Sequence, residues 1–274
     1  MLPAFAGAGA GTRTAAAHAP SADPCFALLS RLPGITRALC QQAQLQPTGR
    51  SSVQGRPILV RDLPAPKNNA KNAAHPTRVL VIGAIHGDEP SAVTLALNWI
   101  ALAQQIPANS EWRFLPALNP DGLLAAKATR TNAHGVDLNR NFPTPNWDHE
   151  APAYWQTRTK KDPRRWPGAK PLSEPESRYI FDEMDSYQPN LIVSIHAPYG
   201  VLDFDGPVIP PQKLGRLYLD QIGIYPGSLG NYAGLTRGIP VVTIELQHAL
   251  KPPNAAETRQ MWLDLLHWMS ARGL

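Results

Sequence analysis

Three short, continuous apolar runs in this chain end in residues that can bind a metal ion or move a proton. Runs of this kind are typical of strands that are covered on both faces in a parallel sheet. The carboxyl ends of parallel strands lie along one edge of the sheet, where functional residues gather. We therefore expect the polar residues at the ends of these runs to meet in space. The runs are 78–85, followed by His86 and Glu89; 191–195, followed by His196; and 240–245, which ends in Glu245.

Helical patterns alternate with the apolar runs and indicate an α/β fold. The alternation predicts a mixed, largely parallel central sheet flanked by helices on both faces. Ser173, with Glu176 three residues later, has the spacing of a capping box and predicts a helix start. The segment 143–172 is rich in Pro, Trp, Lys and Arg and predicts a long loop, which we interpret as a solvated flap packed by its tryptophans. The expected helices are 91–103, 173–187, 212–223 and 255–271.

The N-terminal region bears on compartment and domain organisation. We expect residues 1–23 to be a disordered leader or the remnant of a signal peptide, because a small-residue cleavage pattern occurs at 4–6 without a charged segment before it. We expect residues 24–274 to form a single domain. The only cysteines, Cys25 and Cys40, suit a disulfide in an exported protein or two buried thiols in a cytosolic one. These features favour the periplasm over the cytoplasm.

Composition argues against two classes of partner. The formal net charge is +5, yet the chain has no run of five or six basic residues, so we expect no nucleic-acid partner. No segment has the roughly 18 consecutive apolar residues of a membrane span, so we expect none. A mild positive field suits an anionic substrate. Nothing in the sequence determines the oligomeric state.

His86 and Glu89 offer a ring nitrogen and a carboxylate from one turn. A catalytic zinc ion takes three protein ligands and leaves one position open. His196 ends another buried strand and is the natural third ligand. A single His-x-x-Glu pattern is weak, since most histidines are solvated or structural, but two strand ends that both offer ligands favour one zinc ion per chain.

Glu245 and the segment 137–142 offer the other parts of a hydrolytic site. A glutamate at the end of a buried strand is costly unless it is paired or functional. We expect Glu245 to be a general base rather than the partner of an arginine. Arg140 and Asn139 can bind a carboxylate, the alternative for Arg140 being a surface ion pair. Asp137 can accept the second ring N–H of a zinc-bound histidine.

Six motifs occur in an order that resembles the zinc carboxypeptidase family (carboxypeptidase A-like). The resemblance covers roughly residues 50–270. It implies that His86, Glu89 and His196 are zinc ligands and that Glu245 is the general base. It also implies that Arg130 polarises the scissile carbonyl, and that Asn139 and Arg140 hold the terminal carboxylate of the substrate. The motifs are His-Gly-Asp-Glu at 86–89, Asn-Pro-Asp-Gly at 119–122, Gly-Val-Asp-Leu-Asn-Arg-Asn-Phe at 135–142, Ser-Glu-Pro-Glu at 173–176, Ser-Ile-His at 194–196 and Thr-Ile-Glu-Leu at 243–246.

Within this family, the segments 197–207, 226–230 and 238–246 resemble the bacterial murein peptide amidases. That resemblance implies hydrolysis of the γ-D-glutamyl–meso-diaminopimelate bond in cell-wall peptides. Asp203 and Asp205, in an expected loop after His196, would then line the pocket and meet an amino group of diaminopimelate. The mobile tyrosine of the family has no clear counterpart in this sequence, where Tyr225 and Tyr232 are both near its position. Asp88 is interpreted as a bystander between the metal ligands.

Three other functions remain open at this point. A metallocarboxypeptidase on ordinary carboxylate-terminated peptides would use the same residues. A deacylase of the succinylglutamate desuccinylase or aspartoacylase type would also use a His-x-x-Glu and a later histidine, but the Asn-Arg-Asn-Phe and Ser-Glu-Pro-Glu motifs favour a peptidase. A cell-wall-binding protein without turnover is disfavoured by the intact base and ligand set.

Overall fold

The computed structural model describes residues 25–66, 75–106 and 108–274. The leader expected over residues 1–23 lies outside the described residues. Within the part that is described, no helix is both long and apolar enough to cross a membrane.

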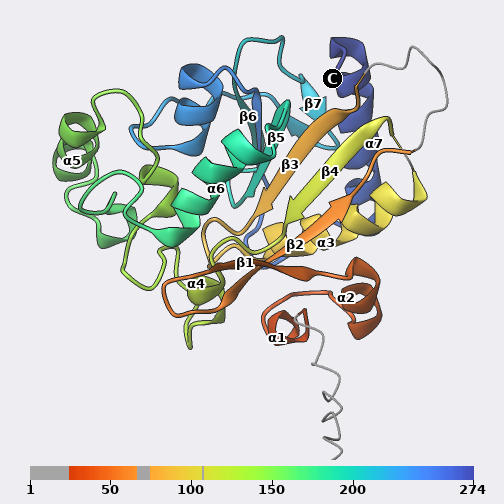
Figure 1. Ribbon diagram of the computed structural model, residues 1–274, viewed down its shortest axis with the longest axis horizontal. Coiled ribbons are helices and arrows are strands. Elements are labelled where there is room, and N and C mark those ends of the chain that lie inside the picture. Colours follow the sequence, from red (N-terminus) through yellow and green to blue (C-terminus); the bar gives the residue numbers. More distant parts are fainter. Residues whose placement is uncertain (1–24, 67–74, 107) are drawn as a thin grey trace, which may run out of the picture.

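Seven strands form one mixed sheet, which confirms the expected fold class (Figure 1). The strand order is β1-β2-β4-β3-β5-β9-β6. The four central strands β4, β3, β5 and β9 run parallel, while β1–β2, β2–β4 and β6–β9 pair antiparallel. A small hairpin of β7 and β8 lies apart from the sheet. The strands are β1 Gln46–Ser51, β2 Pro57–Leu63, β3 Thr77–Gly83, β4 Ser110–Leu115, β5 Leu191–His196, β6 Val201–Asp205, β7 Lys213–Leu214, β8 Leu217–Tyr218 and β9 Val241–Glu245.

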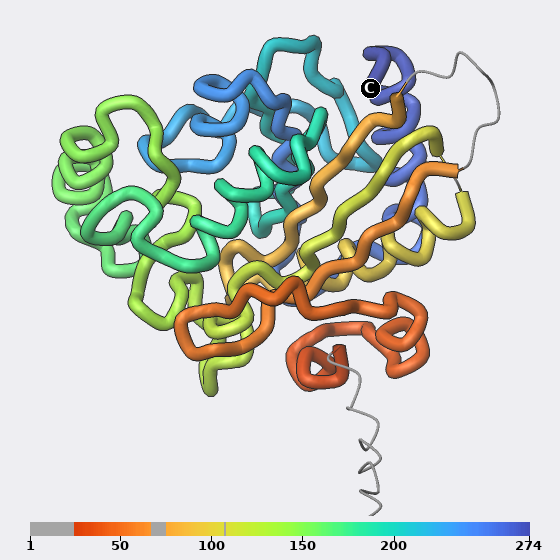
Figure 2. Tube along the Cα trace, in the orientation of Figure 1, coloured from red at the N-terminus to blue at the C-terminus, as the bar shows by residue number. Residues whose placement is uncertain are grey.

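Helices cover both faces of this sheet. Helices α3 and α7 pack on one face, and α6 with the short π-helix η3 packs on the other (Figure 1). In Figure 2 the segment 143–172, in green, lies on the opposite side of the molecule from the C-terminus. The helices are α1 Phe26–Leu29, α2 Arg37–Ala43, α3 Pro90–Gln105, α4 Pro120–Leu124, α5 Trp147–Thr157, α6 Pro175–Ser186 and α7 Ala255–Arg272, with the short elements η1 Leu138–Arg140, η2 Pro163–Arg165 and η3 Gly230–Thr236.

The apolar run that forms β3 explains why this strand lies at the centre of the sheet. Val79 and Val81 point into the core beneath α3 and α7, whereas Leu80 and Ile82 point into the core beneath α6. All four side chains are fully buried. A strand covered on both faces needs apolar residues at every position. The first polar side chains after β3 therefore fall at its carboxyl end, where the pocket opens.

The N-terminal part of the described chain is held by a disulfide between Cys25 and Cys40, whose Cα atoms are 5.5 Å apart. Both cysteines are completely buried. The bond joins α1 to α2, and α2 packs against α3. A disulfide is therefore the alternative that the structure adopts for this pair of cysteines.

One expected helix is wrong. The segment 212–223 forms the β7–β8 hairpin instead, because two carboxylates of α7 take its backbone N–H groups. Glu257 Oε1 accepts from Arg216 N at 2.6 Å, and Asp264 Oδ2 accepts from Gly215 N at 2.7 Å. Gly215 also has a positive φ of 60°, which a helix does not allow.

The prediction of a capping box at the start of α6 is also wrong, although the helix itself is present. The N-cap residue is Glu174, and its side chain caps no backbone group of the helix. Ser173 Oγ donates to Glu174 Oε1 at 2.7 Å instead of accepting from the helix. Glu176 is fully buried and accepts from Val53 N at 3.2 Å and from Asn132 Nδ2 at 3.1 Å. The Ser-Glu-Pro-Glu motif thus ties α6 to distant segments.

Candidate metal centre and active site

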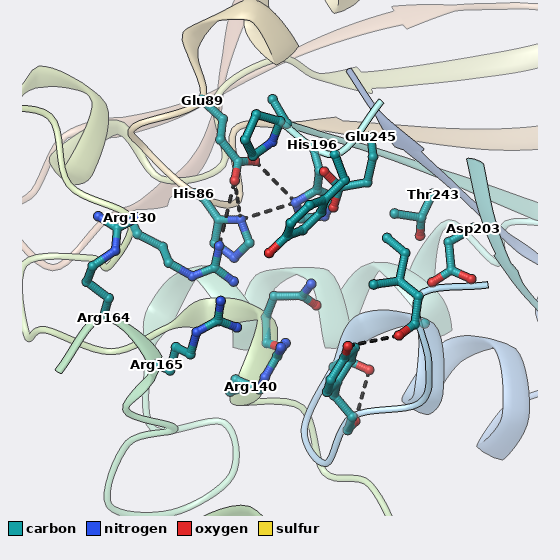
Figure 3. Close-up of a pocket in the computed structure, with 18 of the residues that line it drawn as sticks. His86, Glu89, Arg130, Arg140, Arg164, Arg165, His196, Asp203, Thr243 and Glu245 are labelled. Atoms are coloured by element: carbon teal, nitrogen blue, oxygen red, sulfur yellow. Dashed lines mark hydrogen bonds and ion pairs between the residues drawn. The ribbon is translucent and has the colours of Figure 1, made fainter. Parts of the chain in front are cut away.

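A pocket lies at the carboxyl ends of β3, β5 and β9 (Figure 3). Every site residue expected from the sequence lines it, except Asp137, which lies beneath His86. The strand register explains the convergence, because His196 and Glu245 are direct neighbours across β5 and β9. Gly83 at the end of β3 pairs with Ile195, so the turn that carries His86 follows beside His196.

The turn after β3 depends on close approach between two loops. A Cβ atom on Gly87 would collide with the backbone of Gly122, at the start of α4. Asn119 caps α4 by accepting from Gly122 N at 2.9 Å, and its Nδ2 donates to Arg130 O at 3.3 Å. The Asn-Pro-Asp-Gly motif thus holds the backbone of Arg130 next to the turn that carries His86.

His86, Glu89 and His196 present three donor atoms to one point. His86 Nδ1 lies 2.9 Å from Glu89 Oε1 and 3.1 Å from His196 Nδ1, and His196 Nδ1 lies 3.2 Å from Glu89 Oε2. All three residues are at least 96% buried. Two imidazole nitrogens and a carboxylate are a donor set that suits a catalytic zinc ion. These residues fit the metal that the sequence predicts.

The carboxylate of Glu89 is held in its charged form. Burial acts to raise its pKa, but His86 and His196 outweigh burial and lower the pKa below its usual range. A charged carboxylate is the form that binds a divalent cation.

Each histidine has a partner on its other ring nitrogen. His86 Nε2 lies 3.1 Å from Asp137 Oδ1, and Asp137 is completely buried. His196 Nε2 lies 2.9 Å from Ser194 Oγ. Such contacts fix the orientation and tautomer of metal-binding histidines. The role of Ser194 is missing from the sequence analysis, although the two-residue period of a strand places it on the same face as His196.

Glu245 points into the pocket beside His196 and is only 7% exposed. Its Oε2 atom has no hydrogen-bond partner, and within the described residues Glu245 forms no ion pair with an arginine. Burial raises its pKa, while the neighbouring His196 lowers it. A buried carboxylate with one unsatisfied oxygen has the properties of a general base rather than a structural partner.

Arg130 and Asp137 form an ion pair under the metal ligands. Arg130 Nε donates to Asp137 Oδ2 at 3.0 Å, and Arg130 Nη1 lies 3.7 Å from Glu89 Oε1. Its side chain is 14% exposed and lines the pocket. One edge of the guanidinium is therefore fixed by carboxylates while the group still reaches the cavity.

Arg140 is buried, which rules out a surface ion pair. It is 6% exposed and its Nη1 donates to Asn139 O at 2.6 Å, while its buried Nε has no partner among the residues that the structure describes. Asn139 Oδ1 accepts from Leu229 N at 2.8 Å, so its amide N–H group remains for a ligand. Burial lowers the pKa of Arg140, and nearby Arg130 acts in the same direction. The pair can bind a carboxylate inside the pocket.

The tyrosine next to Arg140 is Tyr225. Its ring lies under the Arg140 guanidinium at 4.6 Å, and it lines the pocket. Tyr232 is instead buried among core residues and stacks with Phe142 and Phe181. Of the two tyrosines left open by the sequence, only Tyr225 can meet a substrate.

Asp203 and Asp205 lie on strand β6 and not in a loop, contrary to the expectation. The antiparallel pairing of β6 with β9 sets Asp203 opposite Thr243, which also lines the pocket. Burial raises the pKa of Asp203. Burial and the Asp203 charge raise the pKa of Asp205 to about 6. Asp203 lies across the pocket from Arg130, Arg164 and Arg165 (Figure 3), and Asp205 lines the same pocket, so the cavity has cationic groups on one side and an acidic group on the other.

Asp88 is not a bystander, since it also lines the pocket. Its Oδ2 accepts from Arg164 Nη2 at 2.9 Å. Arg164 lies on η2 inside the segment 143–172, which contains α5 and η2 and is thus more structured than a loop. The segment brings Arg164 and Arg165 to the pocket. The sequence offered no signal for this approach beyond its cluster of basic residues.

The fold and the pocket together define a hydrolase with a candidate His-Glu-His metal site. The zinc carboxypeptidase family model matches residues 36–203, more than half of the chain. The chain belongs to the zinc carboxypeptidase family.

Named relatives agree with this assignment. Murein peptide amidase A of Vibrio campbellii is 28% identical over 214 residues, which cover 75% of this chain and 79% of that protein. Murein peptide amidase A of Escherichia coli K12 is 36% identical over 127 residues, 45% of this chain and 50% of that protein.

Solved structures support the same fold. The murein-tripeptide amidase of Escherichia coli O157 has a TM-score of 0.54 and 26% identity, covering 80% of this chain and 89% of that chain. Carboxypeptidase A of Helicoverpa armigera has a TM-score of 0.62 and 18% identity, covering 85% of this chain and 70% of that chain. The second likeness concerns the fold alone.

Proposed function

We propose that this protein is a zinc-dependent amidase that hydrolyses the γ-D-glutamyl–meso-diaminopimelate bond of bacterial cell-wall peptides. The observation that carries the proposal is the two-sided pocket around the metal donors and the base. A guanidinium side suits carboxylates, and an acidic side suits an amino group. meso-Diaminopimelate carries both kinds of group. The names of the relatives support a murein substrate.

In this proposal His86, Glu89 and His196 hold one zinc ion per chain. When bound, zinc supplies Lewis-acid chemistry, because it polarises a carbonyl group and lowers the pKa of water. Asp137 and Ser194 keep the two imidazoles oriented through their second ring nitrogens.

Glu245 carries the proton transfers. Its free Oε2 atom takes a proton from the attacking water and returns it to the leaving amine. Arg130 presents its free N–H groups to the carbonyl oxygen, where negative charge develops in the transition state. The Asp137 contact holds the Arg130 guanidinium in place for this task.

Substrate position is set from both sides of the pocket. Arg140 and Asn139 bind the α-carboxylate next to the leaving amine, and the Tyr225 ring supports the Arg140 guanidinium. Asp203 and Asp205 bind the distal amino group of diaminopimelate. Replacing both acids, Asp203→Ala with Asp205→Ala, is expected to lower kcat/KM on murein tripeptide. Unchanged activity would remove these acids from the site.

The test of function is product analysis by mass spectrometry after incubation with L-Ala–γ-D-Glu–meso-diaminopimelate. The parent is expected to release free diaminopimelate, and a Glu245→Ala control is expected to release none. An ordinary carboxypeptidase would instead act on α-linked peptides, and a deacylase on N-acyl amino acids, so both are included as substrates. Preference for either would contradict the proposal, and a metal-free binder would cleave nothing.

We also propose a periplasmic location. A buried disulfide between Cys25 and Cys40 supports an oxidising compartment. Recovery of the active protein in the osmotic-shock fraction, with both thiols blocked to alkylation, is the expected result. Recovery with the cytoplasm, with free thiols, would contradict it.

A further inference from the structure

Two adjacent arginines, Arg164 and Arg165, reach the pocket from the short helix η2. Asp162 starts this helix by accepting from Arg164 N at 2.9 Å. Arg164 Nη2 donates to Asp88 Oδ2 at 2.9 Å, whereas Arg165 Nε lies 3.8 Å from Asp162 Oδ2, beyond hydrogen-bond distance. The proposed chemistry uses neither arginine.

These ion pairs leave most of the guanidinium donors available. A guanidinium carries five N–H donors, and Asp88 takes one from Arg164. The Arg164 side chain is 59% exposed and the Arg165 side chain 34% exposed. Exposed ion pairs contribute little to stability, so holding η2 in place is a weak reason for two arginines here. Both groups retain donors that can form a bidentate contact with a carboxylate.

The position of the pair indicates which part of a substrate it meets. Arg130 and Arg164 line both the active-site pocket and a neighbouring groove that contains Trp155 and Trp166. In Figure 3 Arg130 and Arg164 lie on the side of the metal donors away from Asp203, and Arg165 lies between Arg164 and Arg140. If the leaving amine portion lies towards Asp203, the acyl portion extends past Arg130 towards Arg164 and the groove.

A γ-glutamyl amide has a distinctive group on this acyl side. The amide is made by the side-chain carboxyl, so the α-carboxylate of the glutamyl residue remains free and charged. An ordinary α-peptide bond consumes that carboxylate. A second cationic site on the acyl side, separate from Arg140, would therefore distinguish γ-glutamyl amides from ordinary peptides.

We propose that Arg164, with Arg165 next to it on η2, binds the free α-carboxylate of the γ-glutamyl residue and so selects for this linkage. This assignment rests on the proposed amidase function. Asp88 orients Arg164 from within the metal-binding turn, and Asp162 caps the helix that presents both arginines. The segment 143–172 thereby acquires a role in substrate selection.

The test compares two tripeptides that differ in one group: L-Ala–γ-D-Glu–meso-diaminopimelate and its analogue in which the glutamyl α-carboxylate is a carboxamide. The variants are Arg164→Gln, Arg165→Gln and the double substitution. Arg158→Gln is the matched control, because Arg158 is exposed on the same segment and does not line the pocket. The rate of diaminopimelate release gives kcat/KM for each combination of protein and tripeptide.

The parent is expected to prefer the carboxylate substrate by roughly tenfold to a hundredfold, the range of one charge-assisted hydrogen bond. The double variant is expected to lose that preference while its kcat/KM on the carboxamide stays near that of the parent. The carboxamide rate also reports on folding. Equal loss on both substrates, or a parent without preference, would overturn the role of the arginine pair. A parent that cleaves neither tripeptide would overturn the proposed function itself.

Discussion

Replacing Asp137 by Asn tests how the buried carboxylate links the metal ligands to Arg130. Asp137 Oδ1 accepts from Asn139 N and faces His86 Nε2, both at 3.1 Å, and Oδ2 accepts from Arg130 Nε at 3.0 Å. An asparagine can keep its oxygen towards His86 and Asn139. Its NH2 group then faces the N–H of Arg130, so two donors oppose each other. The substitution also removes the negative charge from both contacts.

The size of the effect follows from these contacts. A hydrogen bond to a charged group contributes about 1.5–3 kcal/mol, against about 1 kcal/mol for a neutral one. Loss of charge from the His86 and Arg130 contacts is thus expected to cost about 2 kcal/mol in transition-state binding, or roughly 30-fold in kcat/KM. Zinc affinity is expected to fall as well, because the carboxylate no longer fixes the His86 tautomer.

The assay measures kcat/KM on murein tripeptide, together with zinc affinity by competition against a chelating dye. Asp148→Asn is the matched control, since Asp148 is exposed on α5 and outside the pocket. The control is expected to match the parent in both measurements. If Asp137→Asn also stayed within about threefold of the parent, a deficit far below that expected for a ligand-orienting carboxylate, the role given to Asp137 would be refuted.

Three further predictions concern other parts of the chain. Burial and Asp203 raise the pKa of Asp205 to about 6, so the protonated carboxyl stabilises the fold at low pH and this stabilisation is lost as the pH rises through about 6. Asp205→Asn should therefore raise Tm at about pH 8 more than at about pH 4. An equal shift of Tm at both pH values would contradict the raised pKa. Tyr225→Ala should lower kcat/KM about tenfold, because the Tyr225 ring no longer supports the Arg140 guanidinium. An unchanged kcat/KM would show that this contact does not contribute to activity. Replacing Cys25 and Cys40 by Ser should lower the free energy of unfolding by about 2–4 kcal/mol in denaturant melts, and an unchanged midpoint would contradict a structural disulfide.

The central sheet and the convergence of its functional residues follow from local patterns. Continuous apolar runs identify β3, β5 and β9, because both faces of these strands are covered. The direct pairing of His196 with Glu245 then follows from strands that end at the same edge. The partners of the metal ligands are less accessible to sequence reasoning. Its sequence motif identifies Asp137 as a partner of a metal-binding histidine. Ser194 can be identified only from the two-residue period of its strand, which places it on the same face as His196.

The parts that resisted sequence reasoning depend on contacts between distant segments. The segment 212–223 has helical spacing, yet carboxylates of α7 hold it as a hairpin. Strand β6, which carries Asp203 and Asp205, is short and is defined by its antiparallel pairing with β9. The approach of Arg164 to the pocket depends on Asp88, 76 residues earlier in the chain. Such contacts leave no periodic signal.

The most direct test of the central claim is a zinc titration of the metal-free protein during turnover of murein tripeptide. We predict that diaminopimelate release rises linearly and saturates at one zinc ion per chain, and that Glu245→Gln binds the same amount of zinc without turnover. Full activity in the presence of chelator, or turnover by the Glu245→Gln variant at the parent rate, would contradict a zinc site at His86, Glu89 and His196 with Glu245 as its base.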